Sequence, residues 1–94
     1  MSNSYKSLAA AQALREDLGI ISETYATLTG NIDGKDYEIK ITLSHNAVKF
    51  FFDEETIHGF SEFSTLFQVM DWNSSKQELN ISSDKPKYSF TIKF

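Results

Sequence analysis

The stretch TYATLTGNIDGKDYEIKITL, residues 24–43, decides the fold of this chain. Apolar and polar side chains alternate on both sides of Asp33-Gly34, which is the period of two that strands show. Asp-Gly between two such segments predicts a tight hairpin turn, because that turn needs positive φ at its central residues. The residues expected on the inner faces of the two strands are Ala26, Leu28 and Ile32 in the first and Tyr37, Ile39, Ile41 and Leu43 in the second.

The same alternation continues in three further segments. After a short turn at residues 44–46, AVKFFFD predicts a third strand with Phe50 and Phe52 on the core face and Phe51 on the opposite face. QELNIS and KYSFTIKF, residues 77–82 and 87–94, predict a second hairpin, with Pro86 in its turn, where a missing N–H does no damage to a sheet. The sequence therefore predicts about five antiparallel strands.

Two segments show helical spacing instead. Leu8, Ala11, Leu14, Leu18 and Ile21 recur every three or four residues, which predicts a helix at about 5–18. Ser4 is the expected N-cap of this helix and Gly19 its expected stop. The positions of Phe63, Leu66, Phe67 and Met70 predict a second helix at about 62–72, although FQVMDW also suits a strand. The predicted fold is a single α+β domain, residues 1–94, of order αβββαββ, with both helices packed on the sheet.

Composition excludes several classes of function. Thirteen acidic and nine basic residues give a net charge of −4, which disfavours direct nucleic-acid binding, since that needs clustered Lys and Arg. The absence of cysteine excludes disulfides, thiolate metal sites and thiol nucleophiles. The N-terminal segment has neither a long apolar run nor a basic leader, so we expect no membrane association and a cytoplasmic location.

The densest group of chemically active side chains is Asp53, Glu54, Glu55 and His58. Carboxylates and imidazole are metal ligands and acid/base groups, so a small metal-dependent enzyme is a minor alternative. The favoured interpretation is a solvated loop, because Gly59 follows at once and the other histidine, His45, belongs to a different turn. The segment GNIDGKD, residues 30–36, fits neither a phosphate loop nor a calcium loop. We therefore expect no cofactor, no metal and no catalytic residue.

Exposed aromatic side chains are the stronger functional signal. Phe51 is expected to point outward beside an acidic turn, and Trp72 to lie where the second helix ends; aromatic anchors dominate the energetics of protein interfaces. The hypothesis for partner binding names Phe51, Asp53, Glu54, Glu55 and Trp72. Two alternatives stay open: the first helix covers the face of Phe51, or KYSFTIKF is an open sheet edge through which two copies form a homodimer.

In size and composition the chain resembles the small, acidic, cysteine-free proteins with which phages and mobile elements block host machinery, anti-CRISPR proteins among them. The resemblance implies a binder. The predicted function is a non-catalytic protein-binding module, most concretely an inhibitor of a nucleic-acid-handling host protein with a basic surface. The alternative is a structural or regulatory subunit that forms homo-oligomers through its sheet edge.

Overall fold

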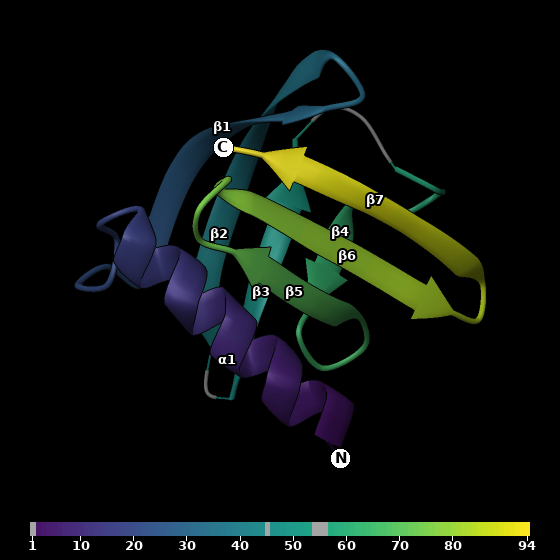
Figure 1. Cartoon of the computed structure of the whole chain (residues 1–94), viewed down its shortest axis with the longest axis horizontal. Helices are drawn as coiled ribbons and strands as arrows, with labels where there is room; N and C mark the ends of the chain where they lie inside the picture. The colour runs from purple at the N-terminus through teal and green to yellow at the C-terminus, as the bar shows by residue number, and fades with distance from the viewer. Residues whose placement is uncertain (1, 45, 54–56) are drawn as a thin grey trace.

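A single helix precedes a strongly curved sheet in the computed structural model, which describes residues 2–44, 46–53 and 57–94 (Figure 1). The helix is α1 (Ser2–Asp17), and the strands are β1 (Tyr25–Ile32), β2 (Lys35–Ser44), β3 (Ala47–Phe52), β4 (Glu62–Ser64), β5 (Val69–Asn73), β6 (Glu78–Asp84) and β7 (Lys87–Lys93). They form one antiparallel sheet in the order β4-β3-β2-β1-β7-β6-β5. The small α+β domain is confirmed, but the described part of the chain has seven strands and one helix rather than five strands and two helices.

The hairpin that the sequence predicted most clearly is confirmed. β1 pairs with β2 along its whole length, ending at Ile32 and Lys35. The two residues between them have positive φ, 52° at Asp33 and 87° at Gly34, as the tight turn requires. The side chain of Asn31 stabilises this turn by accepting a hydrogen bond of 3.0 Å from the Gly34 N–H. The turn chemistry therefore accounts for the segment that superficially suggested an ion-binding loop.

The end of α1 is confirmed, and its expected beginning is wrong. Gly19 has a φ of 74°, and the N–H groups of Gly19 and Ile20 bond to the carbonyls of Glu16 and Arg15, at 3.2 and 2.9 Å. This double closure is the Schellman arrangement, in which a residue with positive φ ends a helix. At the other end, α1 begins before Ser4, so Ser4 lies inside the helix rather than at its N-cap.

The predicted second helix, residues 62–72, is wrong. The segment forms β4, a turn at 65–68 and β5. Phe63 and Met70 are buried, as a helix would have required, but Leu66 and Phe67 are 44% and 78% exposed. Only the turn resembles a helix, since the N–H groups of Phe67 and Gln68 both bond to the Ser64 carbonyl. Four apolar residues at helical spacing thus come from two strands and the turn between them.

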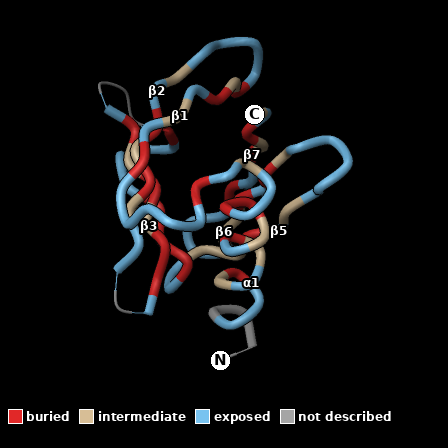
Figure 2. The backbone as a smooth tube through the Cα atoms, turned by 90° about the vertical axis from the view of Figure 1, so that its left-hand side faces the viewer, coloured by how far each residue is buried: buried red, intermediate tan, exposed pale blue. Residues whose placement is uncertain are grey.

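The core lies between two groups of strands, β1–β4 and β5–β7, which Figure 2 shows on opposite sides of the molecule, with buried segments in both. The groups are joined where β1 meets β7, through the single pair Asn31 and Lys93. Fully buried apolar side chains from both groups pack there with Ala11 and Leu14 of α1; they are Ile39, Ile41, Val48, Phe50, Phe63, Met70, Leu79, Ile81 and Ile92. Because α1 packs on this inner side, it leaves the outer face of β1–β4 uncovered.

Both ends of the strand order are protected against pairing with another strand. α1 packs mainly on β5, and the buried Ser7 hydroxyl donates to the Gln68 carbonyl and accepts from the Met70 N–H, each at 2.9 Å. At the other end, β4 is only three residues long. In the strand order β7 lies between β1 and β6, but its pairing with β1 is limited to Lys93 and Asn31, so the rest of KYSFTIKF has no strand paired on that side among the described residues. The homodimer built on that edge therefore stays a prediction.

Candidate functional site

Phe51 lies on the outer face of the sheet, as the alternation of β3 predicted. It is half-buried, and its cross-strand neighbours are Lys40 on β2 and Glu62 on β4. The alternative in which α1 covers this face is wrong, since α1 packs on the inner side.

Two ion pairs flank this ring. The Lys40 Nζ lies 3.2 Å from an Asp53 carboxylate oxygen, and the Lys49 Nζ lies 3.3 Å from a Glu62 carboxylate oxygen. The pKa of Lys40 is raised, and the largest cause is the hydrogen bond that its ammonium group donates to the Asp53 carboxylate. We call Phe51 and the four residues of these two ion pairs, namely Lys40, Asp53, Lys49 and Glu62, the Phe51 patch. Of the other predicted contact residues, Glu54 and Glu55 lie outside the described residues.

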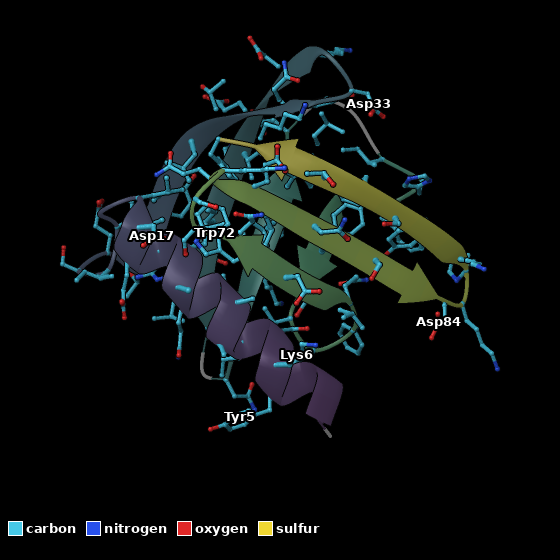
Figure 3. The ribbon with its side chains drawn as sticks, viewed as in Figure 1. Tyr5, Lys6, Asp17, Asp33, Trp72 and Asp84 are labelled. Atoms are coloured by element: carbon cyan, nitrogen blue, oxygen red, sulfur yellow. The ribbon has the colours of Figure 1, made fainter. Side chains whose placement is uncertain are left out.

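Trp72 is separate from the Phe51 patch and has a structural contact of its own. It lies on β5 rather than at the end of a helix, and its indole Nε1 donates a hydrogen bond of 2.6 Å to Asp17 (Figure 3). Its ring also packs against that of Phe94, with 6.2 Å between centroids. These contacts tie β5 to the end of α1 and to the end of β7. Trp72 also lines a polar hollow on the outer face with Asp71 and Glu78.

His58 packs among aromatic rings. It occupies a two-residue turn with Gly59, both with positive φ, closed by mutual hydrogen bonds between Ile57 and Phe60. The imidazole stacks on the Tyr88 ring, with centroids 5.0 Å apart and an interplanar angle of 11°. Within residues 2–44, 46–53 and 57–94, no three His, Cys, Asp or Glu side chains come together as a metal site. Of the predicted cluster, Glu54 and Glu55 lie outside the described residues, and the His58 imidazole stacks on Tyr88.

The structure also forms a concavity that the sequence did not predict. A groove of about 470 Å³ runs between β4 with its following turn and the turn of the β6–β7 hairpin. We call it the seam groove, because it lies where the two strand groups face each other; its walls include Phe60, Glu62, Phe67, Lys85, Pro86 and Tyr88. Phe67 and Phe60 are 78% and 38% exposed. The Lys49–Glu62 ion pair belongs to both the groove and the Phe51 patch, so the two surfaces adjoin.

Tyr88, one of the residues that line the groove, carries a buried polar atom without a partner. Tyr88 is 7% exposed, and its hydroxyl is buried with no hydrogen-bond partner in the part of the chain that the structure describes. Aromatic rings surround it, with the centroids of His58, Phe60 and Phe63 all within 6.0 Å of its own. A buried hydroxyl without a partner costs about 1–3 kcal/mol. Because this atom is closed off from solvent, a molecule in the groove does not reach it in this structure.

The β4 side of the groove is partly closed to main-chain pairing. The Phe52 N–H bonds to the Ser61 carbonyl, so the alternation of an antiparallel pair directs the N–H and C=O of Glu62 and Ser64 away from β3. Those of Ser64 are already used, because its N–H donates to the Gln68 Oε1 at 2.6 Å and its carbonyl accepts from the turn. Glu62 is the one residue of β4 left to pair with an added strand.

Sequence reasoning missed the seam groove for an identifiable reason. It assigned Phe67 to the buried stripe of a helix, whereas the residue projects from a turn. The groove also joins segments about twenty residues apart, 60–68 and 83–88, whose proximity depends on how the sheet curls. One signal was available in the sequence. If FQVMDW is a strand, Leu66 lies directly before its first residue, Phe67, and two adjacent apolar residues of a strand cannot both face the core.

Comparison with known protein families, with curated proteins and with solved structures finds no match to this chain. Among the described residues, no helix is both long enough and apolar enough to span a membrane. Function must therefore be argued from the surfaces themselves.

Proposed function

We propose that this protein is a non-catalytic protein-binding module and that the seam groove with the adjoining Phe51 patch is its contact surface. The observation that carries the proposal is the group of exposed apolar side chains beside the groove, namely Phe67, Leu66 and Phe60 at 78%, 44% and 38% exposure. Exposed aromatic residues that rim a concavity and border charged residues have the anatomy of a protein interface, with apolar anchors inside a polar rim.

The partner that we propose is a larger protein with a basic, nucleic-acid-handling surface, which this chain would block as an inhibitor. The support is electrostatic: the chain carries a net charge of −4, and Asp53, Glu62 and Glu38 outnumber Lys40 and Lys49 on the outer face of β2–β4. Attraction between such a face and a basic partner speeds association and weakens with salt. The resemblance in size and composition to phage-encoded inhibitors of the anti-CRISPR type favours a phage or mobile-element origin.

The proposal is tested by capture of the partner from native host lysate, mass spectrometry, and affinity measurement with the purified partner. Phe67→Ser should weaken binding at least tenfold, since truncation of an aromatic anchor commonly costs 2 kcal/mol or more. The fold should survive, because the side chain is 78% exposed. Ile21→Ser is the matched control, as Ile21 is 63% exposed on the loop after α1.

Two results would count against the proposal. The first is a purified partner that binds wild type and Phe67→Ser with equal affinity, and the second is loss of binding in the Ile21→Ser control as well. Light scattering across micromolar concentrations identifies the remaining possibility, in which the captured partner is a second copy of the chain.

A further inference from the structure

A stripe of exposed side chains runs along α1. Tyr5, Ala9, Gln12 and Glu16 follow one another at spacings of four, three and four residues, so they lie on one face of the helix. All four are exposed, and Tyr5, at 80%, is the most exposed of the large apolar side chains that the structure describes. Its ring projects outward from α1 (Figure 3). This face of the helix is therefore open to contact.

Two hollows lie on this face, one on each side of Gln12. The hollow at the Tyr5 end has a volume of about 210 Å³, and its walls are Tyr5, Leu8, Ala9 and Gln12. The other, which we call the Ile21 hollow, has a volume of about 240 Å³, and its walls are Gln12, Arg15, Glu16, Ile21 and Leu43. Ile21 and Leu43 are apolar, yet they are 63% and 40% exposed. Since an enclosed cavity of about 150 Å³ holds benzene, the Ile21 hollow has room for one aromatic ring.

We infer that α1 pairs with α1 of a second copy in the antiparallel orientation, so that Tyr5 of each copy enters the Ile21 hollow of the other. Tyr5 and Glu16 are eleven residues apart, which is about 16 Å along a helix. A two-fold axis midway between them, beside Ala9 and Gln12, exchanges the two ends, so both contacts form together. The small side chain of Ala9 lies at the crossing and lets the helices approach closely. Such an interface is self-complementary and closes at two copies.

The charges on α1 favour a second copy in this orientation. Lys6 lies in the first half of the helix and Glu16 in the second; both are exposed, and neither makes an ion pair with another residue of the described ranges. Antiparallel pairing brings each Lys6 to the Glu16 end of the other copy and opposes the two helix dipoles, and both effects are favourable. Parallel pairing would bring like charges together. Glu16 also lines the Ile21 hollow, where its carboxylate would accept a hydrogen bond from the incoming Tyr5 hydroxyl.

This surface differs from the one proposed for partner binding. The two hollows share no residue with the seam groove or the Phe51 patch. The exposed charges near the stripe are one lysine and one glutamate, so net attraction does not select the basic partner here. The inference therefore goes beyond the proposed function and does not depend on it.

Sedimentation equilibrium of the purified chain tests the association. A contact made by one helix face and two rings belongs to the weak class of interfaces, below about 1,200 Å², so we expect a dissociation constant on the order of 100 µM. Wild type that stays monomeric at about 1 mM would overturn the inference.

Three variants separate this dimer from the seam groove. Tyr5→Ala and Ile21→Ser should each weaken the dimer at least tenfold, because they remove the inserted ring and a wall of the hollow that receives it. Both should keep the affinity for the partner. Phe67→Ser is the matched control, since its ring is 78% exposed, and it should dimerise as wild type does. The inference is wrong if Ile21→Ser keeps the wild-type dimer, or if Phe67→Ser loses it.

Charge reversal tests the orientation. Lys6→Glu and Glu16→Lys each place like charges together in the antiparallel dimer, so each should weaken it about threefold. The double variant keeps the net charge of the chain and restores opposite charges across the interface, so its dissociation constant should return to within about twofold of wild type. A double variant as weak as the single ones would contradict the antiparallel arrangement.

Disulfide trapping gives an independent measurement, because the chain has no cysteine of its own. Proteins carrying Ala9→Cys and Gln12→Cys, mixed in a glutathione redox buffer, should give more of the mixed dimer than of either homodimer, since antiparallel pairing brings these two positions together. Parallel pairing would link Ala9→Cys to itself, and an excess of that product would overturn the inference. Ser74→Cys, in the turn between β5 and β6, measures linkage by random collision, and an equal yield from it would have the same consequence.

Discussion

Ser7 joins the helix to the sheet, and its replacement by alanine tests that junction. The hydroxyl satisfies two main-chain groups of the β5 edge, the Gln68 carbonyl and the Met70 N–H. Met70 is fully buried, so its orphaned N–H should cost about 1–3 kcal/mol, and the half-buried Gln68 carbonyl, which water can reach, about 0.5–1.5 kcal/mol. Alanine recovers about 0.5 kcal/mol through its higher helix propensity. The net loss expected for Ser7→Ala is about 1–4 kcal/mol.

That loss is large for a domain of this size. At roughly 0.05–0.15 kcal/mol per residue, the free energy of unfolding of a 94-residue domain is about 5–14 kcal/mol. Each kcal/mol moves the melting temperature of such a domain by about 4–8 °C, so the middle of the range corresponds to a decrease of about 10–20 °C. Differential scanning calorimetry and urea unfolding measure the effect. Ala9→Ser, on the exposed side of α1, calibrates the propensity change alone. A Ser7→Ala variant that melts within about 2 °C of wild type would refute the claim that this hydroxyl seals the β5 edge.

Two further predictions concern the residues that the sequence marked as contacts. Trp72→Phe removes the hydrogen bond to Asp17 and should lower the free energy of unfolding by about 0.5–1.5 kcal/mol, measured in urea melts. If Trp72 has only a structural role, the affinity for the partner stays within twofold of wild type. A larger loss of affinity would show that Trp72 belongs to the interface. Asp53→Asn should lower the pKa of Lys40 toward 10.5, measured by NMR titration of its side-chain signals. Because the folded-state pKa of Lys40 is raised, the stabilisation by this exposed pair is present below pH 10.5 and is lost as the pH rises through the folded pKa. An unchanged pKa would show that the pair does not form in solution.

The parts of the fold that local patterns specify were predictable, and those that depend on long-range curvature were not. The turn at Asp33 and Gly34 and the alternation in β1, β2, β3, β6 and β7 are local signals, and the structure confirms them. The spacing of Phe63, Leu66, Phe67 and Met70 could not separate a helix from two strands joined by a turn, because short apolar runs satisfy both periods. β7 could not be recognised as an interior strand, since its neighbour β1 is some sixty residues earlier in the chain.

The candidate site also has features that local sequence patterns predict and features that depend on long-range packing. The outward direction of Phe51 follows from the period of two, and the structure agrees. The inward direction of Tyr88 follows from it as well, but the missing partner of its hydroxyl depends on the rings that the 57–60 turn brings against it. The sequence shows Ser7 as a polar residue four positions before Ala11 on the apolar stripe of α1. The role of Ser7 could not be predicted, because the strand that it contacts was expected to be a helix.

The arrangement of the sheet limits how this protein can bind. α1 and Ser7 close the edge at β5 and Gln68 closes most of the edge at β4, so main-chain pairing contributes little to an interface at either end of the strand order. At these two ends recognition depends on side chains, and the most exposed apolar ones near a concavity are those of the 65–68 turn. The Lys49–Glu62 pair belongs to both the seam groove and the Phe51 patch, so the outer face and the groove share one boundary. A partner of the proposed kind would carry basic residues opposite the acidic outer face, and an apolar side chain beside the 65–68 turn would fix its position on the sheet more tightly than net attraction alone.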